Sequence, residues 1–456
     1  MRGLRGGALA AGAVIVGSLV PLAVASASTG GHAALASITR AVQVSTCGGS
    51  NAEVEEALSG SNVYVEWIGC GGIGFARSTD GGRVFGPSIT LPGSQNTSCS
   101  SSGCTNFSWD PAITVSRTGL VYATFMHRTD TLSAPVVDVS SDQGRTFPQS
   151  VSLPVPATSD PNGNWGDRDF VAVAPSGTVY VTWDYGPSAS ALKFVCSPIG
   201  SCSFTAGDLN AVLQTSTDGG KTWSAVAPIS PHFPLGGADL APILVQPNGT
   251  IDVLFQAFPT QATTDALSPG HEYFTRSRDG GATWSTPIKL GPSAGTVSLT
   301  EWWIDGALGT DSAGNLYATW DTQSAHHDIG WLVSSTKGGS QWSRPIRVTS
   351  PTIDTEQLVE PVGVGRGLAD VAWQTPTPKG YATFVRTYSI AHGWLQPSAL
   401  RVSPAFGNSS VWPGDTFGIA AVPGGRLGSH GSPIVLTWGS ALRARTDQIY
   451  AATVAP

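Results

Sequence analysis

Acidic and tryptophan residues gather at the starts of several predicted strands, in a set that could bind or cleave a sugar. Asp110 opens one such strand, and Asp167, Arg168 and Asp169 open another. The other proposed ligand-binding residues are Asp239, Glu301, Trp302, Glu360 and Asp415. Aromatic faces and carboxylates suit neutral sugar rings, and two close carboxylates could be the acid and base of a glycosidase. The candidates for catalysis are Asp169, Arg168, Glu301 and Asp305.

A structural role competes with this interpretation. Most copies of the strand begin with an acid, as at Asp110 and Asp169, and a recurring aspartate could bind backbone N–H groups of the adjoining unit. Arg168, Glu301 and Trp302 depart from the repeated pattern and are therefore more informative. One arginine among many acids would repel a carboxylate ligand.

Metal binding has weaker support. His326, His327 and Asp328 have suitable residue types but no recognised ligand spacing. Several carboxylates in a funnel could hold Ca²⁺, so calcium stays open as the alternative to no cofactor. The sequence has no Gly-x-Ser-x-Gly elbow, phosphate loop or dinucleotide fingerprint.

The acids belong to a strand unit that repeats along the chain. Apolar residues alternate up to an aromatic, a pattern typical of strands. The repeated aromatics are Trp67, Phe125, Trp183, Phe255, Trp320, Trp373 and Trp438. A turn containing Gly or Asn joins each copy to the strand before it, which predicts hairpins. We therefore expect an all-β, seven-bladed β-propeller, with six blades as the alternative.

A second motif, Ser-x-Asp-x-Gly-x-Thr-Trp, follows the third strand of most units. Its aspartates are Asp80, Asp142, Asp218 and Asp279, and Lys337 takes this place in the fifth unit. A short carboxylate can accept backbone N–H bonds within a turn, and glycine allows positive φ. These aspartates are therefore predicted to be structural.

The motif resembles the Asp-box, or BNR, repeat of the sialidase superfamily. The resemblance implies a propeller and, if the chain is an enzyme, a sialidase-like glycoside hydrolase. Family sialidases hold the substrate carboxylate with three arginines, the first in an Arg-Ile-Pro segment, which this sequence lacks. They also have six blades, so seven units look more like the broader set of Asp-box propellers. A cluster of Arg128, Arg168 and Arg386 in one cavity would favour a sialidase.

The two ends of the propeller are predicted to pair. Residues 448–454 form a third strand with no fourth strand after it, and residues 38–45 resemble a fourth strand. We therefore expect the N-terminal strand to complete the last blade, within a single domain of residues 37–456. Closure of this kind leaves only short, protected edges.

The N-terminus indicates export. Arg2 and Arg5 precede an apolar run that ends in small residues, which predicts a signal peptide over 1–28, with an uncleaved anchor as the alternative. Six cysteines fit an oxidising compartment. The simplest pairing joins Cys99 to Cys104 and Cys196 to Cys202, and leaves Cys47 with Cys70.

The composition limits the kinds of partner that the chain can bind. Charged residues are 12% of the chain and the net charge is -7, which argues against nucleic acid. No later stretch is long and apolar enough to span a membrane. We therefore expect a secreted propeller that binds a carbohydrate or cell-surface ligand in its central funnel. The alternatives are a glycoside hydrolase of the exo-sialidase type and a scaffold that docks another exported protein.

Overall fold

A computed structural model gives the fold of the chain. All the residues that it describes belong to the compact unit His32–Pro456. The described residues are 37–100, 103–196, 202–230, 238–239, 241–257, 271–291, 306–324, 327–349, 357–377, 380–403, 414, 416–423, 431–440 and 446–456. The predicted signal peptide therefore lies outside the described residues.

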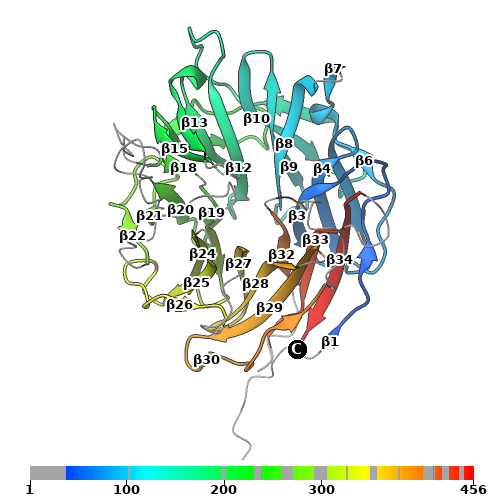
Figure 1. The fold of residues 1–456 in the computed structure, drawn as a ribbon, viewed down its shortest axis with the longest axis vertical. Coiled ribbons are helices and arrows are strands. Elements are labelled where there is room, and N and C mark those ends of the chain that lie inside the picture. Colours follow the sequence, from blue (N-terminus) through cyan, green and yellow to red (C-terminus); the bar gives the residue numbers. More distant parts are fainter. Residues whose placement is uncertain are drawn as a thin grey trace, which may run out of the picture. The chain divides into compact units, whose positions relative to one another are not determined.

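The strands form a seven-bladed β-propeller, as the sequence predicts (Figure 1). Blade 1 consists of β3 (Ala52–Ser59), β4 (Asn62–Gly69), β5 (Gly72–Ser78) and β6 (Ile89–Thr90). Blade 2 consists of β8 (Gly103–Val115), β9 (Val121–Thr129), β10 (Leu132–Ser140) and β11 (Gln149–Ser152), with β7 (Thr97–Ser100) paired to β8. Blade 3 consists of β12 (Trp165–Val173), β13 (Val179–Gly186), β16 (Asn210–Ser216) and β17 (Ala227–Pro228).

The remaining blades repeat this antiparallel order. Blade 4 consists of β18 (Ala238–Asp239), β19 (Ile243–Val245), β20 (Ile251–Ala257), β21 (His271–Ser277) and β22 (Ile288–Lys289). Blade 5 consists of β23 (Ala307–Thr310), β24 (Leu316–Ser324), β25 (His327–Ser335) and β26 (Ile346–Arg347). Blade 6 consists of β27 (Gln357–Gly365), β28 (Leu368–Thr377), β29 (Gly380–Ser389), β30 (Gly393–Trp394) and β31 (Leu400–Arg401).

Blade 7 combines the two ends of the chain. It consists of β32 (Gly418–Ala421), β33 (Ile434–Ser440), β34 (Gln448–Ala455), β1 (Ser37–Ile38) and β2 (Val42–Gln43). Outside the blades lie a hairpin and two single-turn 3₁₀ helices: β14 (Lys193–Cys196), β15 (Cys202–Ala206), η1 (Pro92–Ser94) and η2 (Ala189–Ala191).

The innermost strands form a closed ring around the centre seen in Figure 1. Each contacts the innermost strand of the next blade, in the order β3, β8, β12, β19, β23, β27 and β32, and β32 contacts β3 again. Residues on these seven strands can therefore approach one another across the axis, although they lie far apart in the sequence.

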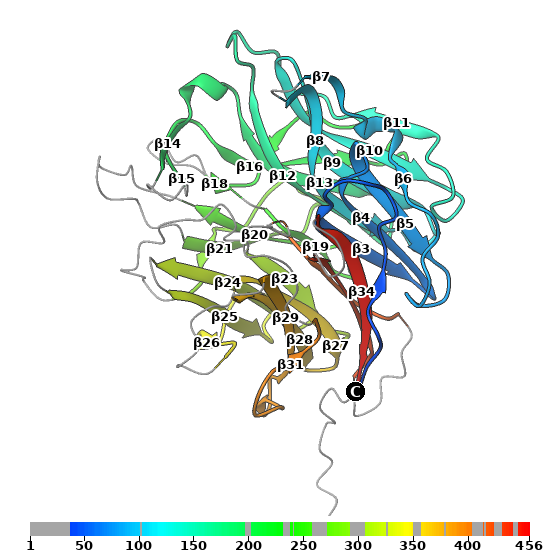
Figure 2. The same ribbon diagram turned by 45° about the vertical axis from the view of Figure 1, so that its right-hand side comes forward.

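The predicted closure is confirmed. Ile38 pairs with Val454 and Val42 pairs with Ala451, so both N-terminal strands lie against β34 (Figure 2). Beside them, the Ser45 hydroxyl donates to Gln448 Oε1 at 2.9 Å. The last blade is thus completed by strands from both ends, which removes its exposed edge.

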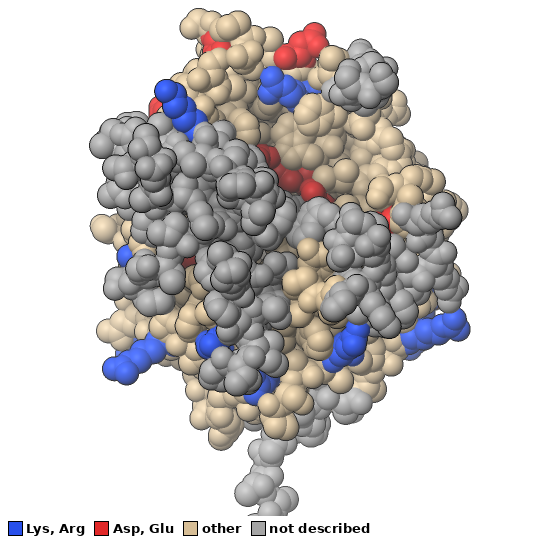
Figure 3. All heavy atoms as spheres, viewed as in Figure 1, with Lys and Arg blue, Asp and Glu red and all other residues tan. Residues whose placement is uncertain are grey.

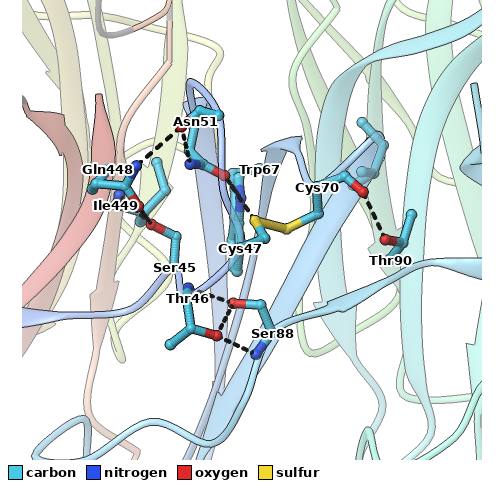
Figure 4. The surroundings of a disulfide bond; sticks show 12 residues. Ser45, Thr46, Cys47, Asn51, Trp67, Cys70, Ser88, Thr90, Gln448 and Ile449 are labelled. Atoms are coloured by element: carbon cyan, nitrogen blue, oxygen red, sulfur yellow. Dashed lines mark hydrogen bonds between the residues drawn. A yellow bond between two sulfur atoms is a disulfide. The ribbon is translucent and has the colours of Figure 1, made fainter. Parts of the chain in front are cut away.

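A disulfide fastens this closing segment to blade 1. Cys47 is bonded to Cys70, which follows β4, across 23 residues of chain (Figure 4). Such a cross-link disfavours the unfolded state by limiting its freedom. The register places Cys99 opposite Cys104 and Cys196 opposite Cys202. The side chains of these four cysteines lie outside the described set, so their pairing stays a prediction.

The repeated aromatic residues form the core. All seven are at most 4% exposed. The aromatic that ends the turn motif packs against the preceding blade: the ring centroids of Phe147 and Phe75 are 4.9 Å apart, and those of Trp342 and Phe274 are 5.1 Å apart. The turns therefore join neighbouring blades as well as strands.

The aspartate of each turn motif accepts hydrogen bonds from its own turn. We call the four turns that contain Asp80, Asp142, Asp218 and Asp279 the aspartate turns. Asp218 Oδ1 accepts the N–H groups of Lys221 and Thr222, each at 3.0 Å. Gly220, at φ 84°, donates its N–H to Ser216 Oγ at 2.9 Å. Hydrogen bonds from hydroxyl and N–H groups of the turn lower the pKa of each of the four carboxyl groups, that of Asp279 to about 2.

Candidate functional site

Among the described residues, the innermost strands of four blades share a bulge. The ladder of β3, β8, β12 and β27 shifts register there, and one residue in each takes a positive φ. These residues are Glu53 (51°), Asp110 (47°), Arg168 (45°) and Leu358 (53°). Positive φ is uncommon outside glycine, and bulges often redirect side chains beside functional sites.

The bulge corrects the alignment of the repeats. Asp110 and Arg168 both take the positive φ, so these two residues are equivalent. In addition, Phe170 lies opposite Thr182 as Ala112 lies opposite Thr124. Asp169 therefore occupies the position of Pro111 and is not a copy of Asp110. The interpretation of Asp169 as part of the repeated acid was wrong, because it matched Asp169 with Asp110 and so placed the two strands one residue out of register with their equivalent ends at Val115 and Val173.

Arg168 is held by Asp110. Asp110 Oδ2 accepts the backbone N–H of Arg168 at 2.9 Å, and Asp110 Oδ1 lies 3.8 Å from Arg168 Nη1. Both residues are buried. Burial raises the pKa of Asp110 to about 8, and the charge of Asp167 adds to this shift while Arg168 opposes it. Asp167 itself accepts the indole N–H of Trp109.

Glu55 and Glu360 act on Arg168 from two other blades. Burial raises the pKa of Glu55, on β3, to about 8, against the opposing charge of Arg168. Burial likewise raises the pKa of Glu360, on β27, well above its usual range, and the charges of Glu55 and Glu56 add to this shift. Both side chains are only partly buried. Blades 1, 3 and 6 are not neighbours, so these residues meet across the axis.

Glu66 and Asp169 are carboxyl groups buried without donors. Glu66, on β4, is 0% exposed and Asp169 is 3% exposed. Among the described residues, no hydrogen-bond donor reaches either oxygen of either group; the hydroxyl of nearby Thr124 donates to the carbonyl of Ala112 at 2.8 Å. Burial raises the pKa of Glu66, and the charges of Asp169 and Glu55 add to the shift. Burial also raises the pKa of Asp169.

These residues define one site at the axis. We call Glu55, Glu66, Asp110, Asp169 and Glu360 the axial carboxyl cluster. In the space-filling view, acidic atoms lie in a hollow near the middle of the face seen in Figure 3. Burial and mutual repulsion favour the protonated form of these groups. The cluster can therefore donate hydrogen bonds when protonated and accept them, or balance a cation, when ionised.

The sequence interpretation missed Glu55, Glu56 and Glu66. Glu66 stands in the aromatic strand, where four other copies have threonine: Thr124, Thr182, Thr319 and Thr437. The other two copies have Leu254 and Ala372, so a carboxylate that occurs in one copy alone was the signal that could have identified Glu66. Glu56 is also buried, and its Oε2 accepts the hydroxyl of Thr437 in blade 7.

Several predicted site residues cannot be assigned to this cluster. Glu301, Trp302, Asp305, Asp415 and His326 lie outside the described residues, as do the side chains of Asp239, His327 and Asp328. Within the described ranges, no three His, Cys, Asp or Glu residues are grouped to hold a metal ion. Calcium therefore remains an untested prediction.

The arginines that would indicate a sialidase make other contacts. Arg128 donates to the Ser133 hydroxyl at 3.2 Å and to the Asn162 carbonyl at 3.1 Å. Arg386 donates to the Gln396 carbonyl, and its guanidinium carbon lies 4.8 Å from the centre of the Trp394 ring. Both guanidinium groups are thus bound by residues of their own blade or of the loop next to it. Arg168, by contrast, interacts with the axial carboxyl cluster.

Solved propeller structures are similar to this chain at low identity. An ulvan lyase, a polysaccharide lyase bound to -[GlcA(1-4)Rha3S]-, is 10% identical, covers 90% of this chain and 95% of its own, and gives a TM-score of 0.55. A Dyadobacter fermentans protein of unknown function is 12% identical, with coverages of 80% and 100% and a TM-score of 0.52. The NanB sialidase of Streptococcus pneumoniae is 11% identical, with coverages of 86% and 83% and a TM-score of 0.49.

These similarities establish the fold and not the activity. The structural neighbours include carbohydrate-active propellers, but a shared fold does not determine chemistry. No family model matches the chain, and no curated protein matches it. In the described part of the structure, no helix is long and apolar enough to cross a membrane.

Proposed function

We propose that this chain is an exported carbohydrate-binding propeller whose ligand enters at the axial carboxyl cluster. The observation that carries the proposal is that the closed ring of innermost strands brings Glu55 and Glu360, from non-neighbouring blades, within electrostatic range of the same arginine, Arg168. Both glutamates are partly exposed, so a ligand can reach them. The Cys47–Cys70 disulfide supports an oxidising, extracellular location.

The geometry suits a sugar because it combines hydrogen-bond donors and acceptors within the closed ring of innermost strands. Protonated carboxyl groups donate and ionised ones accept, as ring hydroxyls require. The closed ring of innermost strands holds these groups in place without ligand, which lowers the entropic cost of binding. Similar propellers that act on saccharides add support at the level of the fold.

A glycan array followed by calorimetric titration tests this proposal. We expect at least one saccharide to bind, and the double variant Glu55→Gln, Glu360→Gln to weaken it by about tenfold or more. Asp130→Asn is the control, since Asp130 is exposed at the turn between β9 and β10. Unchanged affinity in the double variant would place the site elsewhere.

Glycoside hydrolysis is the second candidate. It is favoured by Glu55, because a pKa raised to about 8 keeps this group protonated at neutral pH, as a general acid must be. A panel of fluorogenic aryl glycosides, including a sialoside, tests it. We expect Glu55→Gln to lower any turnover by about a hundredfold or more, and no sialoside cleavage, given the positions of Arg128 and Arg386. A flat signal across the panel removes this candidate.

A further inference from the structure

The charge around the axis is unbalanced. Arg168 is the one basic side chain that acts on the axial carboxyl cluster within the described ranges. It is already close to Asp110, through both its backbone N–H and its guanidinium group. Glu55, Glu360, Asp169 and Asp110 therefore share the charge of one arginine, and no basic side chain acts on Glu66 within the described ranges.

Two members of the cluster are buried with little compensation: Glu66 has no hydrogen-bond donor among the described residues, and Asp169 has only the nearby Thr124 hydroxyl, which lowers its pKa against the effect of burial. Glu66 and Asp169 are 0% and 3% exposed. A buried carboxylate without a donor or a cation is unfavourable. Their electrostatic interactions with Glu55 and Arg168 place both groups against the cluster. Protonation therefore keeps these carboxyl groups neutral in the empty site, and a nearby cation would favour their ionised form.

We propose that the axial carboxyl cluster selects a saccharide that carries a free, protonated amine. This inference rests on the proposed function and names the ligand class of the same site. An ammonium group supplies one positive charge and three donors, so it can compensate Glu55 and Glu360 directly and lower the repulsion from Glu66 and Asp169 behind them. A neutral sugar supplies donors without charge, and an anionic sugar adds to the repulsion.

Proton exchange is a consequence of this arrangement. Glu55 faces Arg168 and Asp169 on β12, Glu66 on β4 and Glu360 on β27, with Glu56 beside it on β3. In the empty site these carboxyl groups hold protons, because each ionisation is opposed by burial and by its neighbours. An incoming ammonium favours their ionised form, so protons leave as the ligand binds.

Two matched oligosaccharides test the proposal on the full propeller. The probes are the tetramer of glucosamine and the tetramer of N-acetylglucosamine, which share ring and linkage and differ only in the amine. Near neutral pH we expect the glucosamine tetramer to bind at least about tenfold more tightly. Titrations in two buffers of different ionisation enthalpy should show net proton release for the glucosamine tetramer.

The variants separate this proposal from a general loss of folding. Glu55→Gln and Glu360→Gln should each reduce the preference for the amine without lowering the melting temperature, and Asp130→Asn should leave both unchanged. Equal or tighter binding of the N-acetylated tetramer overturns the amine proposal but leaves carbohydrate binding in place. Failure of every saccharide on the array to bind overturns the proposed function and this inference with it.

Discussion

Two sets of carboxyl groups in this propeller have opposite surroundings. The aspartate turns lie at the surface, and each carboxylate accepts N–H groups from its own turn, as Asp218 does from Lys221 and Thr222. In the axial carboxyl cluster, Glu66 and Asp169 are buried and receive no hydrogen bond from the described residues. Accordingly, the pKa of Asp218 is lowered and that of Glu66 is raised.

The two sets differ in whether the same carboxylate recurs from blade to blade. A carboxylate that recurs in several blades is compensated within its own unit, because each unit must be stable against its neighbours. Glu66 and Asp169 each occur in one blade only. Neither lies in a turn whose N–H groups donate to it, as the aspartates of the aspartate turns do. The repeated acids are therefore explained by stability, and the unique acids require another explanation, which we place in ligand binding.

The largest expected effect is a loss of stability with rising pH. The pKa of Glu66 is raised above its usual 4.5, and that of Glu55 is raised from 4.5 to about 8. The folded state therefore binds more protons than the unfolded state between these values, so the free energy of unfolding falls as pH rises through this window. We expect a loss of a few kcal/mol between about pH 5 and about pH 9, measured by denaturant unfolding.

The variant Glu66→Gln sharpens this prediction. It keeps the shape of the side chain and removes its charge, so the slope against pH should become flatter. Asp370 and Asp138, whose pKa values burial raises to about 7 and about 6, contribute to the slope in both proteins. Asp130→Asn should leave the slope unchanged. A wild-type protein that gains stability through this window would contradict our account of the cluster.

A smaller effect is expected at the aspartate turns. Asp218→Ala removes the acceptor of the Lys221 and Thr222 N–H groups, and the hydroxyl of Thr222 loses its bond to Oδ2 at 2.6 Å. We expect the thermal midpoint to fall by a few degrees with saccharide affinity unchanged, measured by a melting curve and a titration. Because the pKa of Asp218 is lowered, its contribution is complete at neutral pH and is lost only as the solution becomes strongly acidic.

This prediction separates the two regions directly. Asp218→Ala should lower stability without changing saccharide affinity, whereas Glu55→Gln should lower saccharide affinity without lowering stability. If Asp218→Ala lowered saccharide affinity as much as Glu55→Gln, the aspartate turns would contribute to binding as the axial carboxyl cluster does. Our distinction between the two regions would then be wrong.

The sequence predicted the fold because its strongest signals repeat. The aromatics from Trp67 to Trp438 fixed the number of blades, and the strand near residues 38–45 predicted how the ring closes. The site was harder to predict, because Asp169 stands one position after the repeated acid, where blade 2 has Pro111, and because Glu55 and Glu360 come into electrostatic range only through the geometry of the ring. Arg168 was identified because it departs from the repeat, and the same criterion applied to Glu66 would have revealed the cluster.

The smallest expected effect comes from restoring the altered turn in blade 5. There the serine half of the turn is intact, since the N–H groups of Lys337 and Gly339 donate to Ser335 Oγ at 3.2 Å and 3.0 Å. The carboxylate half is absent, so Lys337→Asp should give the N–H groups of Ser340 and Gln341 an acceptor. We expect a gain below about 1 kcal/mol, because Gln341 has no hydroxyl to match that of Thr222 in the turn of blade 3.

Lys337→Ala is the matched control, because it removes the lysine charge without adding an acceptor. If backbone N–H groups need the carboxylate, Lys337→Asp melts above both Lys337→Ala and the wild-type protein. Equal melting of the two variants would show that charge alone matters at this turn. Hydrogen bonds from the N–H groups of the turn would then not explain why the aspartate is repeated. The contrast between the aspartate turns and the buried carboxyl groups at the axis would lose its physical basis.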